Sequence, residues 1–268
     1  MTAQTAAQAA AVRVREPATL ELRDVRKHYG GLRAVDGVSA AAEPGRVLGI
    51  AGPNGAGKTT LFDVVSGLTA PTAGDVLLGG RSLTGISAHR RCHVGMARTF
   101  QQPTVTTGLT VRENLVVASR FGRAREHWEG VGDDVGAHVG WALRWGGLDG
   151  RAADPAALLG VFDRKRLMLA AAMAVGPRVL LLDEPFGGLN AEEIDAMLAL
   201  VRSAAELGVA VVCIEHVMRA LVQLADRVLV MHRGGVLFEG SPSAMLADRR
   251  VIETYLGSAQ ARGGEGRG

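Results

Sequence analysis

The fold is decided by the stretch Gly52-Pro53-Asn54-Gly55-Ala56-Gly57-Lys58-Thr59-Thr60, which contains a complete G-x-x-x-x-G-K-[ST] phosphate loop. Residues 47–51 before it are apolar and typical of a buried strand, and residues 61–65 after it are typical of a helix. The backbone N–H groups of a glycine-rich turn and the positive end of a helix dipole together bind phosphate. The stretch therefore predicts a nucleoside triphosphate site, in which Lys58 reaches the β- and γ-phosphates and the Thr59 hydroxyl holds Mg²⁺.

Two adjacent carboxylates, Asp183 and Glu184, follow a second apolar segment, residues 179–182. Ligands of a parallel sheet lie beyond the carboxyl ends of its strands, so we expect both carboxylates beside the phosphate loop. Asp183 is then placed to hold Mg²⁺, directly or through water. Glu184, one residue further, is placed to orient and deprotonate a water that attacks the γ-phosphate.

The composition of the 268-residue chain is that of a globular protein, with 47% hydrophobic and 21% charged residues. Aromatic residues make up only 4% and the net charge is only +3, so we expect no nucleic-acid partner. Cys92 and Cys213 form no C-x-x-C pair, which predicts neither a zinc site nor a disulfide framework. The chain has no apolar stretch of about 18 residues and no secretory signal pattern, so we expect neither a membrane span nor a leader.

Apolar segments alternate with helical segments along most of the chain, which predicts a parallel sheet covered on both faces. The fully apolar strands are residues 47–51, 179–182 and 209–214. Residues 20–25 and 35–42 are predicted strands near the N-terminus, and residues 228–231 and 236–238 a hairpin at the edge of the sheet.

The middle of the chain differs, because strong strand signals disappear from about residue 103 to residue 160. Thr110 is a plausible N-cap, and Glu113 three residues later completes a capping box that opens a helix over residues 111–119. A weaker helical pattern follows at residues 141–145. We therefore predict a helical insertion in the nucleotide-binding core.

The phosphate loop and the carboxylate pair together resemble those of the ATP-binding subunits of ABC transporters, over about residues 20–256. The resemblance implies that Tyr29 stacks on adenine and that His216 contacts the γ-phosphate. It implies that Gln101 senses Mg²⁺, as a nucleotide-binding and metal-site residue, and that Gln101 contacts the permease. Gln102 is the alternative to Gln101 if the register is shifted by one residue. ATP and Mg²⁺ are the implied cofactors, and Glu184 and His216 the implied catalytic residues.

Finer motifs look like the branched-chain amino acid importer group and its relatives for urea and other amides. They are residues 29–34, 98–101, 187–190, 214–218, 239–242 and 251–257. The resemblance implies an importer subunit at the cytoplasmic face of the membrane, bound peripherally. Its implied partners are integral-membrane permease subunits and a second ABC ATPase subunit.

The expected fold class is α/β, a P-loop NTPase core with a mostly parallel sheet, N-terminal antiparallel strands and a helical subdomain insertion. A RecA-like ATP-binding core is expected at residues 18–102 and 164–257, and the helical subdomain at residues 103–163. Residues 1–17 and 258–268 are rich in small or polar residues and are predicted to be disordered tails.

The chain departs from the family at the signature loop, which reads Leu159-Gly160-Val161-Phe162-Asp163, beginning 24 residues before Asp183. The family has Leu-Ser-Gly-Gly-Gln here, and its serine and glycine amides bind the γ-phosphate held by the opposite subunit. Gly160 has no hydroxyl to donate, and a side chain as large as Phe162 is expected to obstruct the close backbone approach that glycine permits. We therefore expect a heterodimer, whose partner has an ordinary signature loop, rather than a homodimer.

Two other interpretations remain open from the sequence. The chain could be the ATPase of a different ABC system, such as an exporter or a lipid-handling transporter. It could also be an ATP-binding regulatory subunit with little turnover. The degenerate signature loop favours the regulatory interpretation, whereas the intact Glu184 and His216 oppose it.

Overall fold

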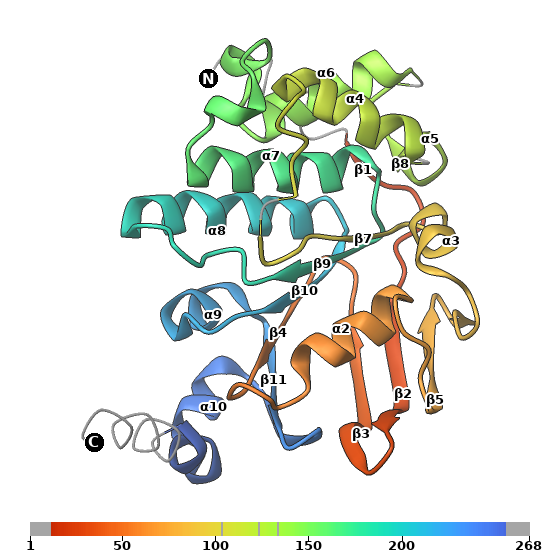
Figure 1. The fold of residues 1–268 in the computed structure, drawn as a ribbon, viewed down its shortest axis with the longest axis vertical. Coiled ribbons are helices and arrows are strands. Elements are labelled where there is room, and N and C mark those ends of the chain that lie inside the picture. The colour runs from red at the N-terminus through yellow and green to blue at the C-terminus, as the bar shows by residue number, and fades with distance from the viewer. Residues whose placement is uncertain (1–11, 103, 123, 133, 256–268) are drawn as a thin grey trace.

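A computed structural model describes residues 12–102, 104–122, 124–132 and 134–255 (Figure 1). The central sheet is mostly parallel. Its strands are, in spatial order, β12 (Gly235–Gly240), β11 (Arg227–His232), β4 (Val47–Ala51), β10 (Ala210–Ile214), β9 (Val179–Asp183) and β7 (Met96–Arg98). A hairpin of β11 and β12 closes one edge, as predicted from the sequence. The expected α/β class with a mostly parallel sheet is confirmed.

An antiparallel sheet lies beside the central one, as expected. Its order is β3 (Leu32–Ala42), β2 (Leu20–Tyr29), β5 (Ala73–Leu78) and β6 (Arg81–Ser82). Strand β9 shows why the central strands are apolar throughout. Val179 and Leu181 pack into one core with the antiparallel sheet, whereas Leu180 and Leu182 pack into a second core against helices on the other face. A strand that is buried on both faces has no solvent-exposed face on which polar side chains could lie.

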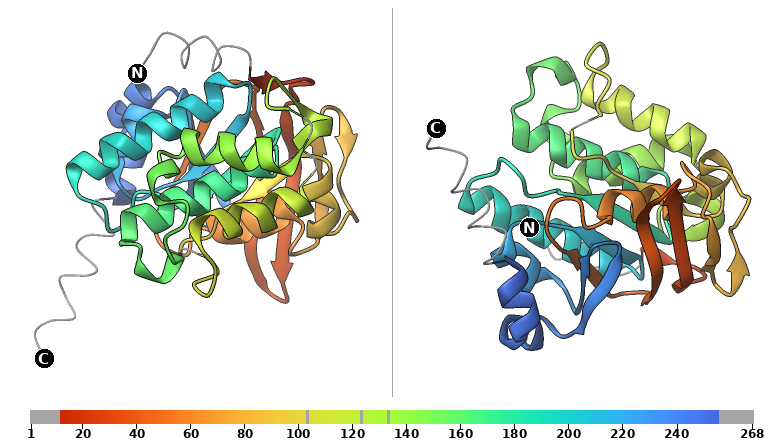
Figure 2. Two further views of the ribbon diagram at one scale, coloured as in Figure 1. Left: turned by 90° about the horizontal axis from the view of Figure 1, so that it is seen from above. Right: turned by 60° about the horizontal axis from the view of Figure 1, so that its bottom comes forward.

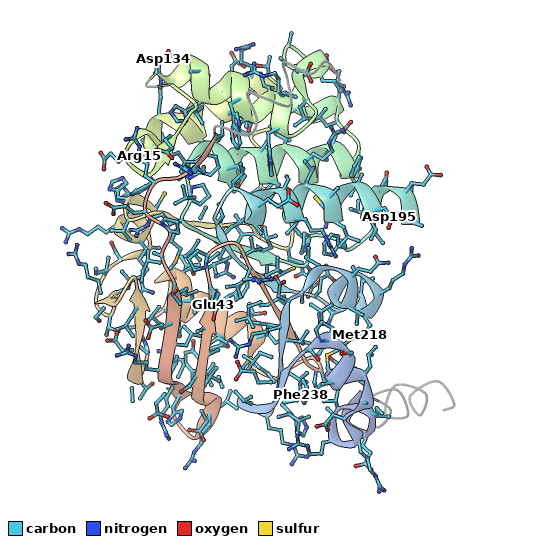
Figure 3. All side chains as sticks on the ribbon, turned by 180° about the vertical axis from the view of Figure 1, so that it is seen from behind. Arg15, Glu43, Asp134, Asp195, Met218 and Phe238 are labelled. Atoms are coloured by element: carbon cyan, nitrogen blue, oxygen red, sulfur yellow. The ribbon has the colours of Figure 1, made fainter. Side chains whose placement is uncertain are left out.

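Helices cover both faces of the central sheet (Figures 1 and 2). The α-helices of the described residues are α2 (Lys58–Ser66), α3 (Ala88–His93), α4 (Val111–Phe121), α5 (Ala124–His127), α6 (Val135–Trp145), α7 (Val161–Ala174), α8 (Ala191–Glu206), α9 (Met218–Leu224) and α10 (Pro242–Ala247). Figure 3 views the molecule from behind, with Asp134 at the start of α6 and Phe238 in β12 near opposite ends of the long axis. No helix among the described residues is long and apolar enough to cross a membrane.

The predicted capping box is present at the start of α4, where the Thr110 Oγ1 accepts from the Glu113 N–H at 3.2 Å and the Thr110 N–H donates to Glu113 at 2.7 Å. Helices α4, α6 and α7 pack around a core of their own. The expected domain boundary after residue 163 falls inside α7. This helix belongs to both parts, because Leu167 contributes to the helical core and Leu169 to the core against the sheet.

The prediction of a disordered tail through residue 17 is wrong for residues 12–17. Strand β1 (Arg13–Val14) pairs with β8 (Trp128–Glu129) of the helical insertion, and the Val14 N–H donates to the Leu207 carbonyl at 2.9 Å. Val12 and Val14 are only 5% and 3% exposed. Burial of these two valines holds the segment, and their alternation with Arg13 was its sequence signal. Residues 1–11 and 258–268 lie outside the described residues.

Candidate functional site

The phosphate loop is a turn that only glycine can make at two positions. Gly52 has φ 146° and Gly57 has φ 101°. A Cβ at Gly52 would lie 2.3 Å from the Met231 carbonyl oxygen, and one at Gly57 would lie 2.1 Å from that of Ala34. Backbone of β3 and β11 therefore packs directly on the loop, which fixes its shape before any ligand binds.

Helix α2 begins at Lys58 and points its N-terminus into the loop. Its N-cap, Gly57, makes no side-chain capping bond, and the first turn carries no acidic residue. The unmade N–H bonds and the helix dipole are therefore available to an anion. The Lys58 ammonium, 6% exposed as a residue, donates to the carbonyls of Gly52 at 2.7 Å and Pro53 at 2.9 Å. Burial lowers the pKa of Lys58, an effect that Glu184 and Asp183 oppose.

A pocket of about 660 Å³ opens at this helix end and joins most of the predicted residues. Its predicted lining residues are Asn54, Gly55, Gly57, Lys58, Thr59, Thr60, Gln101, Glu184 and His216. Tyr29 is half exposed and does not line the pocket, but it pairs across β2 and β3 with Leu32, which does. Arg33 and Arg233 also line it and were not predicted, because each is a single basic residue at a strand end or turn.

Glu184 lines this pocket and contacts two of the other predicted residues. Its Oε1 is 2.6 Å from the His216 Nε2, and its Oε2 accepts from the Gln101 Nε2 at 2.8 Å. The sequence therefore predicted the members of this cluster, and the structure shows them in direct contact. Glu184 has φ 50°, which is costly for a residue with a side chain and recurs at functional sites.

A buried brace that the sequence did not reveal holds the backbone of Glu184. Lys165 of α7 donates to the carbonyls of Glu184 and Pro185, each at 3.1 Å. Glu215, 1% exposed, accepts from the backbone N–H groups of Phe186, His216 and Val217 at 2.8–2.9 Å. Both side chains fix the loops that carry the catalytic candidates, so we assign them a positioning role.

Asp183 ends β9 behind the pocket and is 7% exposed. Burial raises the pKa of Asp183, whereas Arg98, whose Nη2 is 3.2 Å from its Oδ2, acts in the opposite direction. A buried carboxylate and the hydroxyl of Thr59 are hard oxygen donors, which suits Mg²⁺. Magnesium commonly takes one or two protein ligands and completes its shell with phosphates and water. The residues present therefore fit this ion together with a nucleotide.

The signature loop forms the start of α7, far along the chain from the pocket residues of β3 and α2. Gly160 is the N-cap and makes no side-chain bond, and Asp163 in the first turn pairs with Arg151 and with Arg166, the latter at 3.0 Å. The expectation that Phe162 projects as an obstacle needs correction. Its ring is partly buried against the core and lies 5.2 Å from the Arg166 guanidinium carbon.

The exposed side chains at this helix end are therefore different ones. Leu158 is 74% exposed and Val161 is 56% exposed. The ring of Phe162 finds apolar contacts within its own chain, whereas Val161 points away from them. At this helix end, residue 160 therefore offers no hydroxyl and Val161 is exposed, while Phe162 still stands at a position where the expected signature has glycine.

Comparisons with known proteins agree with this geometry. Residues 35–187 match the ABC transporter family. The chain is 34% identical over 250 residues to the high-affinity branched-chain amino acid transport ATP-binding protein BraF of Pseudomonas aeruginosa, covering 90% of this chain and 98% of that one. It is 32% identical over 253 residues to LivG of Escherichia coli, which carries the same description, with the same coverage.

Solved structures show the same relationship. A crystal structure of the ADP conformation of MJ1267, an ATP-binding cassette of an ABC transporter, superposes with a TM-score of 0.79 at 25% identity. It covers 90% of this chain and 99% of that one. A nucleotide-free cassette superposes with a TM-score of 0.77, also at 25% identity. The chain belongs to the ABC transporter family, as one of its ATP-hydrolysing subunits.

Proposed function

We propose that the chain drives an importer of branched-chain amino acids or related amino acids and amides, using ATP with Mg²⁺. The observation that carries the proposal is the contact of Gln101, Glu184 and His216 beside the phosphate loop. The full-length similarity to BraF and LivG supports the substrate class. In this proposal the subunit binds peripherally to permease subunits at the cytoplasmic face of the membrane.

The residues of the pocket have separate tasks in this proposal. The backbone N–H groups of residues 54–60 and the Lys58 ammonium bind the phosphates, while Tyr29 stacks on adenine. Thr59 and Asp183 hold Mg²⁺, which neutralises phosphate charge when bound. Glu184 accepts the proton of the attacking water, and His216 orients the γ-phosphate. Release of Glu184 from Gln101 and His216 frees its oxygens for that water.

The second ATPase subunit is proposed to be a different chain. The composite sites of the family need a signature loop from each side, and the start of α7 offers neither a hydroxyl at residue 160 nor a glycine at residue 161. A heterodimer keeps one site complete, because the pocket of this chain would close on the ordinary loop of its partner. This same observation favours the alternative of a regulatory subunit with little turnover of its own.

A groove for the permease is proposed between α3, α4 and α7. It encloses about 360 Å³ and is lined by Phe100, Val117 and Met168 among other residues. Phe100 precedes Gln101, so a partner seated here contacts the segment that reaches Glu184. Phe121 of α4, 70% exposed, extends the apolar surface beyond this groove.

Isolation of the tagged chain from membranes tests the proposal, with the copurified chains identified by mass spectrometry. We expect permease subunits and a second ATPase in the wild-type complex. The variant Val117→Asp is expected to lose the permease and to keep nucleotide binding. Val236→Asp is the matched control, because Val236 is similarly exposed, at 40% against 44%, and lies on β12 outside the groove. Membrane complexes without a permease, or equal loss in both variants, would contradict the proposal.

A further inference from the structure

Arg98 is a buried arginine at the end of β7, and its side chain is 7% exposed. Its Nη1 donates to the Asp63 Oδ1 at 2.7 Å and to the Ser66 Oγ at 3.0 Å. Its Nη2 donates to the Asp183 Oδ2 at 3.2 Å. One guanidinium therefore joins the phosphate-loop helix α2 to the carboxylate that ends β9.

Two aromatic rings lie beside this guanidinium. The ring centroid of Phe62 lies 5.5 Å from the Arg98 guanidinium carbon, and that of Phe100 lies 5.0 Å from it. Such distances are within the range of cation–π contacts. Because Phe62 belongs to α2 and Phe100 immediately precedes Gln101, the arginine contacts α2, the end of β9 and the segment that leads to Gln101.

The charge balance around Arg98 is consistent with a further cation. The guanidinium faces two carboxylates, Asp63 and Asp183, and carries one positive charge against their two negative charges. It engages Oδ2 of Asp183, which leaves Oδ1 for another ligand. Burial of a carboxylate is costly unless it is paired, so the arginine also keeps Asp183 in a defined orientation.

We propose that Arg98 is a positioning residue that orients Asp183 toward Mg²⁺ and holds it in register with Thr59 on α2. The inference rests on the proposed function, since Mg²⁺ accompanies the nucleotide. Partners that orient a metal ligand typically change metal affinity by roughly 10- to 100-fold when they are removed. A lysine cannot replace Arg98, because a single ammonium cannot span both carboxylates as the planar fork does.

The test compares ATP affinity by calorimetry with Mg²⁺ and with EDTA, in the full chain. In EDTA we expect Arg98→Lys to bind ATP as the wild type does, within about twofold. In the wild type we expect Mg²⁺ to increase the ATP affinity by roughly 10- to 100-fold, and in Arg98→Lys we expect this increase to be absent. Asp63→Asn is expected to lose a smaller part of that gain, and it keeps Arg98 itself if the lysine variant fails to fold.

Arg91→Lys is the matched control. Arg91 is also buried, but it donates to the backbone carbonyls of Ile86, Val64, Val65 and Leu83 and to no carboxylate. We expect the control to lower thermal stability and to keep the Mg²⁺-dependent gain. The binding of Mn²⁺·ATP, followed by electron paramagnetic resonance, is expected to show an altered metal environment in Arg98→Lys alone.

Three results would overturn the inference. The Mg²⁺-dependent gain could be unchanged or larger in Arg98→Lys, which would make Arg98 neutral or a competitor of the metal. Affinity could fall equally in EDTA and Mg²⁺, which would assign Arg98 to the shape of the phosphate loop. A wild-type chain that binds ATP neither with Mg²⁺ nor in EDTA would instead remove the proposed function itself, and the inference with it.

Discussion

Helices α2 and α7 both begin after a glycine, but only the N-terminus of α2 is available to bind an anion. Helix α2 follows Gly57 and helix α7 follows Gly160, and neither N-cap makes a side-chain bond. The first turn of α2 has no acidic residue and begins with Lys58, so its N-terminal dipole is available to phosphate. The first turn of α7 contains Asp163, which already supplies a negative charge and pairs with Arg151 and Arg166.

The difference shows that an uncapped helix N-terminus is not sufficient for an anion site. At α2, backbone of β3 and β11 packs on the phosphate loop, and residues of this loop line a pocket. At α7, exposed Leu158 and Val161 flank the N-cap, and the local carboxylate compensates the dipole. In the proposed heterodimer, the pocket at α2 is the half of the ATPase site that this chain supplies, and the signature loop is the half that its partner supplies.

The largest expected effect is on ATP hydrolysis, when Glu184 in the pocket at α2 is replaced. We expect Glu184→Gln in the assembled complex to slow ATP hydrolysis about 10²- to 10⁴-fold, because the amide cannot accept a proton from water. ATP binding is expected to persist, since the amide still fits between Gln101 and His216. Steady-state phosphate release and filter binding measure the two properties. Wild-type turnover in the variant would assign proton acceptance to another group or all turnover to the other site.

The next effect concerns Lys58. Lys58→Ala removes a charge-assisted contact to the phosphates, worth about 1.5–3 kcal/mol in all, so we expect ATP affinity to fall roughly 10- to 150-fold. Calorimetric titration measures it, and a thermal melt verifies that the variant is folded. The matched change at the other helix, Arg164→Ala in the first turn of α7, is expected to leave ATP affinity of the isolated chain unchanged. Equal losses in both variants would remove the contrast between the two helix ends.

The start of helix α8 provides a reference for how much an N-cap contributes to the free energy of unfolding of this chain. Helix α8 begins after Asn190, whose side chain accepts from the Glu193 N–H at 3.0 Å in a complete capping box. We expect Asn190→Ala to destabilise the chain by about 1 kcal/mol, the usual contribution of an N-cap. Chemical denaturation followed by circular dichroism measures this. A loss below the error of the measurement would show that tertiary packing, rather than the cap, fixes the start of α8.

The smallest stability effect is expected at α7. Gly160 has φ −65°, and a Cβ added there would meet no other atom within 4 Å, so a serine fits without strain. We expect Gly160→Ser to stabilise the chain by only a few tenths of a kcal/mol, because glycine is nearly as good an N-cap as serine. Denaturation midpoints compared with those of Asn190→Ala measure it. A marked destabilisation would mean that the serine disturbs the Arg151–Asp163–Arg166 cluster.

The sequence predicted the pocket well because its parts are local motifs with fixed spacing. Residues 52–60 specify a strand-to-helix turn. The apolar run before Asp183 and Glu184 places these two residues at the carboxyl end of a strand of the parallel sheet. The direct contact of Glu184 with Gln101 and His216 was not foreseen, because it joins three loops whose approach depends on the packed sheet.

Other features depended on tertiary packing and left little sequence signal. Strand β7 has only three residues, so the position of Arg98 between two carboxylates could not be predicted. Lys165 stands in the basic run Arg164-Lys165-Arg166, which carries no sequence signal of burial, but it is buried and holds the Glu184 backbone. Phe162 was expected to project, but packing against its own core and Arg166 turns the ring inward.

The most direct test of the contrast between the two helix ends is ATP hydrolysis by the purified chain alone, over concentrations at which homodimers form. We predict that the wild type binds ATP but hydrolyses it roughly 100- to 1,000-fold more slowly than a complex with a partner whose signature loop is complete. The reason is that a hydrogen-bond donor to the γ-phosphate is missing in the homodimer. Gly160→Ser combined with Val161→Gly is predicted to raise the rate of the isolated chain. Brisk hydrolysis by the wild type alone, rising with the square of its concentration, would contradict the account and show that the backbone at the start of α7 is sufficient.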